Sequence, residues 1–229
     1  MRKRMVFFVF VALFFFWEQR CGAAPIYGPK MPKKNQFFIG VQSHWVVRRS
    51  LEKEYGKMRS LQHFLLISYG FTEWLSLDLK GGAGNIKSKP SISNEIDYTS
   101  GLAGGYGVRL RLYEFDRSKI VFGFQHISAH PESSKIAETK HKAVLDDWQF
   151  SLLASHSFSH VTPYIGTRWS RTDHIHWIES DRKRERSDLT KGVGVIAGVE
   201  VPVHERAWFT VEGSLLDAES VAVSLTMAF

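Results

Sequence analysis

Apolar and polar residues alternate along most of this chain, and the alternation is clearest at its end. Val221, Val223, Leu225, Met227 and Phe229 share one face of an extended strand, and the small or hydroxylated residues between them share the other. Successive side chains of a strand point to opposite faces of a sheet. The pattern therefore predicts an all-β protein whose sheet separates two different environments.

Ten segments have this strand character, and the connections between them are alternately long and short. The predicted strands are 37–47, 61–70, 74–83, 98–113, 119–128, 145–158, 161–171, 192–201, 208–213 and 221–229. The long connections include 84–94, 129–142 and the charged stretch 180–188. Outer-membrane barrels have short periplasmic turns, long external loops and strands of about ten tilted residues. The sequence predicts a closed antiparallel up-and-down transmembrane β-barrel of about ten strands.

The closing strand resembles the last strand of bacterial outer-membrane β-barrels, in which a terminal Phe is part of the signal read by the barrel-assembly machinery. The resemblance implies that Phe229 is the assembly signal and that this machinery is a partner. It also implies a location in the bacterial outer membrane. An even number of strands would then place both chain termini in the periplasm.

The N-terminus has the pattern of a cleaved secretory signal. Arg2, Lys3 and Arg4 precede an apolar run at 5–17, and small residues follow at 22–24. The run is shorter than the roughly 20 residues of a transmembrane helix, so we expect a signal peptide at 1–23. A periplasmic N-terminal segment at 24–36 and the barrel at 37–229 would follow. Acylation of Cys21, as in a lipoprotein, is the alternative.

Composition does not distinguish a soluble protein from a membrane barrel, but the net charge bears on whether the protein binds nucleic acid. Hydrophobic residues make up 44% of the chain and the mean hydropathy is −0.18, values that a soluble domain could share. Only alternate residues of a membrane barrel face lipid, so long apolar runs are not expected. Removing 1–23 takes away four basic residues and one acidic residue, which lowers the formal net charge from +7 to +4. No nucleic-acid partner is expected.

The face opposite the lipid-facing one carries charges of both signs. We expect these residues to pair across the lumen as a charge network of Asp78, Lys80, Arg109, Arg111, Asp147, Arg168, Glu200 and Glu212. A barrel of about ten strands has a narrow interior that such side chains can fill. The prediction is a largely plugged polar lumen, with a narrow or gated pore as the alternative.

Aromatic residues gather near both ends of the predicted strands. Those near the short turns are Tyr69, Phe71, Trp74, Tyr113, Phe115, Phe158, Trp208 and Phe229, and those toward the long loops are Trp45, Tyr98, Trp148 and Trp169. Two aromatic girdles are typical of membrane barrels. A soluble barrel of the lipocalin kind would instead place its apolar face inside.

One stretch, 122–130, could carry chemistry. His126 and Ser128 lie two residues apart on the lipid-facing side, and this His-x-Ser pair resembles the motif of the outer-membrane lipid A deacylases. The resemblance implies that Ser128 is the nucleophile and His126 its base, with Asp146 on the neighbouring strand as the orienting acid. In that family the pair lies near the C-terminus and is usually followed by Asn, whereas Ala129 follows it here. A polar rim without catalysis is the other interpretation.

Other candidate sites are weaker. His126 and His130 would be about 13 Å apart along a strand, and His174 and His176 have no clear carboxylate partner, so no metal site is expected. The basic stretch 182–186 either contacts lipopolysaccharide phosphates or forms an ordinary solvated loop.

The sequence thus predicts a monomeric integral outer-membrane barrel with a structural, surface-interaction or narrow-permeability role. Its expected partners are outer-membrane lipids, lipopolysaccharide and the assembly machinery, and no cofactor is expected. We expect that the protein is not an enzyme. A lipid A esterase using His126 and Ser128 is the first alternative, and a small channel is the second.

Overall fold

The computed structural model describes residues 27–52, 55–91, 94–136 and 138–229, so the predicted signal peptide and its cleavage site lie outside the described residues. The strands are β1 (Phe37–Ser50), β2 (Lys57–Gly70), β3 (Leu75–Lys89), β4 (Ile96–Phe115), β5 (Ser118–His130), β6 (Ser134–Ile136), β7 (Thr139–His156), β8 (Thr162–Ile178), β9 (Asp181–Arg186), β10 (Val193–His204), β11 (Ala207–Leu215) and β12 (Glu219–Ala228). A short 3-10 helix, η2 (Leu189–Lys191), precedes β10. No helix within these residues has the length and apolarity to cross a membrane.

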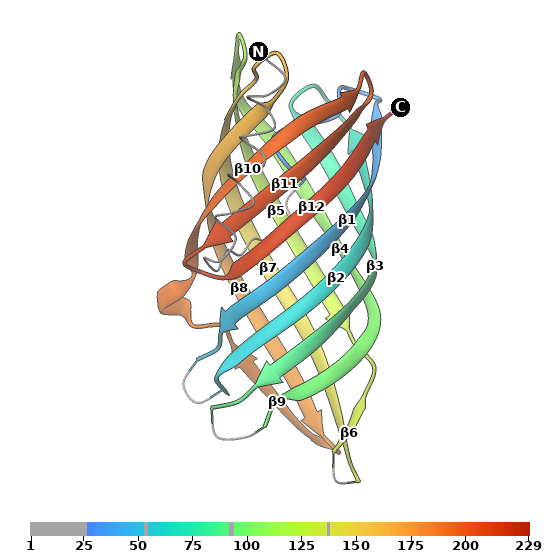
Figure 1. Cartoon of the computed structure of the whole chain (residues 1–229), viewed down its shortest axis with the longest axis vertical. Coiled ribbons are helices and arrows are strands. Elements are labelled where there is room, and N and C mark those ends of the chain that lie inside the picture. The colour runs from blue at the N-terminus through green and yellow to red at the C-terminus, as the bar shows by residue number, and fades with distance from the viewer. Residues whose placement is uncertain (1–26, 53–54, 92–93, 137) are drawn as a thin grey trace, which may run out of the picture.

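Ten of these strands form the wall of a closed antiparallel barrel, and β6 and β9 are short additions at one end (Figure 1). Each wall strand pairs with the wall strands that precede and follow it in the chain, including β7 with β8. The pairing of β1 with β12 closes the ring. At the seam the register runs from Phe38 opposite Ala228 to Trp45 opposite Val221. The structure confirms the predicted fold class and strand number.

The wall has an apolar outer face and a buried inner face. Outward-pointing Val41 and Leu79 are 58% and 57% exposed, whereas inward-pointing Gln42 and Asp78 are 4% and 1% exposed. A barrel in water could not keep such an outer face exposed without association. The alternation therefore places lipid outside and a filled interior inside.

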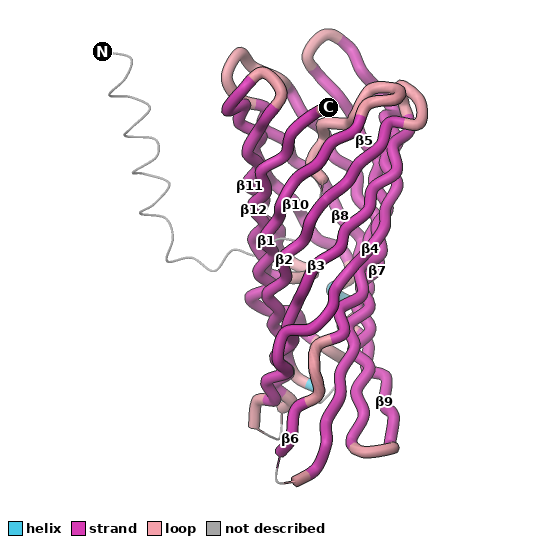
Figure 2. The backbone as a smooth tube through the Cα atoms, turned by 90° about the vertical axis from the view of Figure 1, so that its right-hand side faces the viewer, coloured by secondary structure: helices cyan, strands magenta, loops and turns pink. Residues whose placement is uncertain are grey.

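The strands at the long-loop end continue further than the sequence predicts (Figure 2). β3 extends to Lys89 through part of the predicted loop at 84–94, and β9 lies within the charged stretch at 180–188. β8 pairs with β10 as far as Trp169 and with β9 from Asp173 onward. These extensions carry charged side chains, which need no apolar face because water rather than lipid surrounds them.

Two residues assigned to the aromatic girdles face the interior instead. Tyr98 is fully buried, because the β3–β4 register shifts between Gly84 and Ile86 and reverses the direction of the side chains beyond it. Trp208 is 3% exposed and packs edge-on against Phe38 with ring centroids 4.7 Å apart.

The interior is also less polar than predicted. Near the long-loop end, Met58, Ile86, Tyr98 and Leu145 are buried together inside the barrel, and Ile127 joins this cluster. We call these five residues the apolar layer. Because the closed wall separates them from water as well as from lipid, their burial is favourable even on the inner face.

The segment that precedes β1 packs against the inside of the barrel. Residues 27–36 are here called the plug: Tyr27, Gly28 and Pro29 are largely or fully enclosed in the lumen at the short-turn end, and residues 33–35 are exposed at its mouth. The plug crosses the end of β2 so closely that a Cβ at Gly70 would lie 1.9 Å from the carbonyl oxygen of Lys33. Glycine at position 70 is therefore needed to admit the plug.

Candidate functional site

Arg109 on β4 joins the plug to the barrel wall. Its Nε and Nη2 atoms each donate a hydrogen bond of 2.8 Å to the Asp78 carboxylate on β3, and Nη1 donates to the carbonyl oxygens of Tyr27, Gly28 and Lys30, the last at 2.6 Å. The Arg109 side chain is 3% exposed and that of Asp78 is 0% exposed. A buried ion pair is held at low cost only when such hydrogen bonds satisfy it.

The plug makes further contacts around Glu200 on β10. The backbone N–H of Lys30 donates to the Glu200 carboxylate at 3.3 Å, and the Lys30 ammonium lies 3.7 Å from the centre of the Trp208 ring. Gly28 has a φ of +72°, and a Cβ there would lie 2.4 Å from the same carboxylate. Burial lowers the pKa of Lys30, and nearby Glu200 opposes that shift.

A second buried network closes the lumen toward the long-loop end. Asp217, in the turn between β11 and β12, accepts hydrogen bonds of 2.7 and 2.8 Å from Arg168 on β8. Arg49 on β1 reaches the same carboxylate at 3.3 Å and also donates to Ser170 and Ser187. This network ties three distant parts of the chain together inside the barrel.

Other predicted lumen residues take separate partners. The Lys80 ammonium donates to Gln42 at 3.3 Å and to Gln125 at 3.0 Å. The Tyr164 hydroxyl donates to Glu212 at 2.8 Å. Most of the predicted residues thus line a filled interior, and Arg109 and Asp78 join directly in an ion pair.

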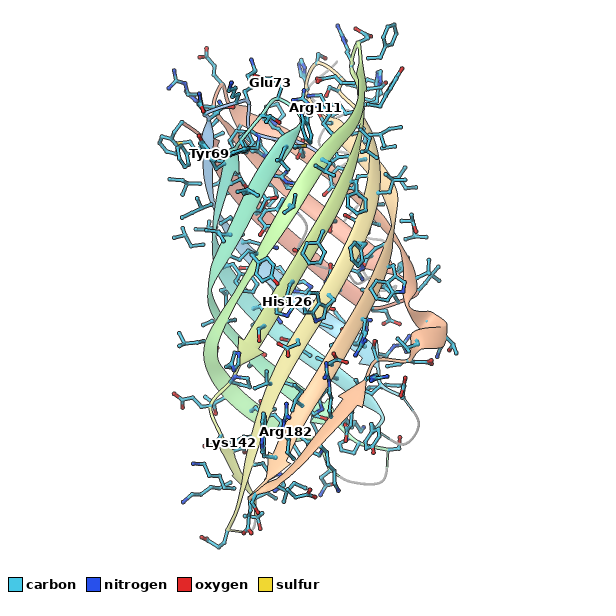
Figure 3. The ribbon with its side chains drawn as sticks, turned by 180° about the vertical axis from the view of Figure 1, so that it is seen from behind. Tyr69, Glu73, Arg111, His126, Lys142 and Arg182 are labelled. Atoms are coloured by element: carbon cyan, nitrogen blue, oxygen red, sulfur yellow. The ribbon has the colours of Figure 1, made fainter. Side chains whose placement is uncertain are left out.

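Asp147 and Arg111 complete the predicted set. Asp147 accepts a hydrogen bond of 2.9 Å from Thr172 inside the barrel. Arg111 does not join the lumen network: it lies at the short-turn rim, where it pairs with Glu114 and approaches Glu73 at 3.9 Å (Figure 3). The β4–β5 register shifts just beyond Arg111, and the barrel opens to water there.

Arg49 and Asp217 are the principal residues that sequence reasoning missed. Strict alternation along β1 would point Arg49 outward, but the register shifts between Val46 and Arg49 turn its side chain inward. Asp217 lies in a link that resembles an ordinary turn. A bulge and a turn carry no periodic signal, so alternation could not identify either residue.

The lumen contains little free space. Two cavities inside the barrel measure about 20 and 10 Å³, each enough for about one water molecule. A larger cavity of about 190 Å³ lies at the short-turn end beside Lys30, Lys119 and Trp208. Neither interior cavity has room for a solute larger than water.

The second candidate site lies on the outer surface, on β5 and β7. The Ser128 hydroxyl is 2.6 Å from the Asp146 carboxylate and 2.9 Å from Nε2 of His130. The register sets Ser128 directly opposite Asp146. His126 Nε2 is 3.8 Å from the same carboxylate oxygen, too far for a hydrogen bond, and the described contacts include no bond between His126 and Ser128.

The imidazole of His126 makes aromatic contacts instead. Its ring centre lies 4.2 Å from that of Trp148 and 5.4 Å from that of Tyr106. The geometry therefore brings Ser128 and Asp146 together but replaces His126 with His130 as the nearest imidazole. The sequence analysis considered His130 only as a metal ligand, because the family motif names the histidine that precedes the serine as the base.

A closed barrel of ten antiparallel strands, with an apolar outer wall, aromatic residues at its rims and a filled interior, is an outer-membrane β-barrel protein. No family model matches the sequence, and no curated protein matches it.

Among solved structures, the chain is similar to several bacterial outer-membrane proteins. An outer-membrane channel from Pseudomonas putida F1 has a TM-score of 0.47 and 9% identity, covering 90% of this chain and 100% of that one. The outer-membrane protease OmpT from Escherichia coli has a TM-score of 0.47 and 11% identity, covering 90% and 99%. OprG from Pseudomonas aeruginosa has a TM-score of 0.39 and 10% identity, covering 87% and 98%.

Proposed function

We propose that this protein is a closed, non-conducting barrel of the outer membrane with a structural or surface-interaction role. The observation that supports the proposal is the double obstruction of the lumen. The plug is bonded to Arg109 at one end, and the Arg49–Asp217–Arg168 network and the apolar layer fill the interior toward the other. An ion entering this lumen would have to displace several buried charge-assisted hydrogen bonds.

Planar bilayer recordings of the purified mature chain test the proposal. We expect no discrete conductance steps over many insertions, while a known porin inserted under the same conditions provides the positive control. Insertion is verified separately by the shift in gel mobility between heated and unheated samples. Reproducible unitary steps from the wild-type protein would refute the closed barrel and support a channel.

A second candidate function, hydrolysis of a lipid ester, is favoured by the contacts of Ser128. In this reaction the Ser128 oxygen would attack the ester carbonyl and His130 would accept the hydroxyl proton, later returning it to the leaving alcohol. Water would then release the fatty acid from the serine. Asp146, which accepts a hydrogen bond of 2.6 Å from the Ser128 hydroxyl, would hold the serine side chain in position.

Mass spectrometry of lipopolysaccharide after incubation with the protein tests this candidate. Loss of an acyl chain that disappears with Ser128→Ala would support it. A matched control is Ser43→Ala, since the Ser43 hydroxyl lies 2.9 Å from Nδ1 of His63 on the same outer wall, with no carboxylate in the described contacts of that pair. If the wild type releases no fatty acid from lipopolysaccharide or phospholipid, this candidate is eliminated.

A further inference from the structure

Basic side chains gather on the outer surface where β7, β8 and β9 extend past the aromatic rim. Across these strands Lys142 is opposite Trp177, which is opposite Arg182, and four residues further toward the membrane along β8 Asp173 is opposite Arg186. Lys142 and Arg182 lie close together at the end opposite Arg111 and Glu73 (Figure 3). We call Lys142, Arg171, Arg182, Arg184 and Arg186 the cationic patch.

The direction of these side chains follows from their neighbours. On β8, Arg168 and Ser170 point into the lumen, so alternation points Asp173 and Trp177 outward. On β9, Glu185 points inward and lies 3.4 Å from His174. The arginines on either side of Glu185 therefore share the outward face.

The patch has more positive charge than its own carboxylates balance. Arg171 and Arg184 pair with Asp173, whose side chain is 1% exposed. Asp146, another carboxylate on the outer face, accepts a hydrogen bond from Ser128. No acidic residue in the described part of the chain forms an ion pair with Lys142, Arg182 or Arg186, and all three are exposed.

The opposite side of the barrel differs in this respect. The outward-facing cations Arg59 on β2 and Lys87 on β3 pair with Glu95 and Asp97 respectively. Two of the outward-facing cations on that side are thus balanced by carboxylates, whereas Lys142, Arg182 and Arg186 are not balanced by any carboxylate among the described residues.

The surface next to the patch is apolar and aromatic. The guanidinium of Arg182 lies 5.5 Å from the centre of the Trp177 ring. Closer to the membrane, Phe150 and Trp169 face outward with ring centres 5.7 Å apart. A ligand that fits both regions has an anionic headgroup beside the cations and acyl chains along the wall below.

We propose that the cationic patch binds the phosphate groups of a phosphorylated glycolipid in the outer leaflet. Arginine forms bidentate hydrogen bonds with phosphate oxygens, and each basic residue near an anionic lipid surface adds to the attraction. The proposal depends on neither the closed lumen nor the reaction at Ser128.

Binding of diphosphoryl lipid A to the purified mature chain in zwitterionic detergent tests the proposal. The test variant is Lys142→Gln, Arg182→Gln and Arg186→Gln together, which leaves the Asp173 ion pairs intact. Each substitution should weaken binding about fivefold, and the triple variant about a hundredfold if the effects add. High salt should reduce the difference between variant and wild type, because exposed charges are screened.

The matched control removes three cations from the other side of the barrel through Lys57→Gln, Arg59→Gln and Lys87→Gln. It should bind diphosphoryl lipid A as the wild type does, and both variants should retain heat-modifiable mobility. The proposal fails if the patch variant binds normally or if the control loses affinity equally. It also fails if fully dephosphorylated lipid A binds as tightly, or if inorganic phosphate at the same phosphate concentration abolishes binding.

Discussion

Replacing Arg109 with glutamine removes the guanidinium that joins the plug to the barrel wall. In the wild type, the Arg109 guanidinium donates hydrogen bonds to both oxygens of Asp78, at 2.8 Å each, and to the carbonyl oxygens of Tyr27, Gly28 and Lys30. Glutamine leaves the Asp78 carboxylate buried without its cation. Removing one partner of a buried ion pair costs about 3–5 kcal/mol, so we expect a loss of this size in the free energy of unfolding.

Urea unfolding in detergent micelles measures that loss, and limited proteolysis measures release of the plug. Arg111→Gln is the matched control, because its ion pairs lie at the exposed rim and such pairs contribute about 0–1 kcal/mol. Arg109→Gln should make residues 27–36 sensitive to protease, whereas Arg111→Gln should not. Equal stability of the two variants, with the plug protected in both, would refute the reasoning.

Bilayer recordings separate the two obstructions of the lumen. Arg109→Gln should remain without conductance steps, because the apolar layer and the Arg168–Asp217 pair still fill the other end. Conductance steps from Arg109→Gln, with none from the wild type, would mean that the plug by itself blocks the passage of ions.

The remaining predictions concern other parts of the barrel. Asp217→Asn should lower the free energy of unfolding by about 3–5 kcal/mol, because it leaves Arg168 buried without a charged partner; chemical denaturation measures this. Deleting Phe229 removes its backbone hydrogen bonds with Phe37 and the expected assembly signal, so outer-membrane fractions of cells should contain less folded barrel. Normal insertion without Phe229 would contradict the signal role. Gly70→Val should expel the plug, seen as new protease cleavage within residues 27–36.

Alternation made the fold predictable because each strand meets lipid on one side and a filled interior on the other. Alternation did not predict the strands correctly where they leave the membrane and lipid no longer covers their outer face. β9 has charged residues on both faces, and beyond the membrane both faces of a strand can be polar. Register shifts reversed the direction of Arg49 and Tyr98, and no sequence period reports a shift.

The candidate sites were predictable in part. The strand pattern placed Ser128 and Asp146 on neighbouring strands, and the register sets them opposite each other. The choice between His126 and His130 depends on side-chain rotamers, which the sequence does not specify. The entry of Tyr27 into the lumen depends on space left by the whole barrel, which no local pattern describes.

The two hairpins β6–β7 and β8–β9 extend beyond the rest of the wall (Figure 1). The β11–β12 turn, by contrast, is held inward through Asp217. Antibodies and phages approaching the cell would therefore meet these two hairpins first. The turn at Glu179 and Ser180 is exposed and makes no contact with the buried networks, so a foreign epitope inserted there should be displayed without loss of the barrel.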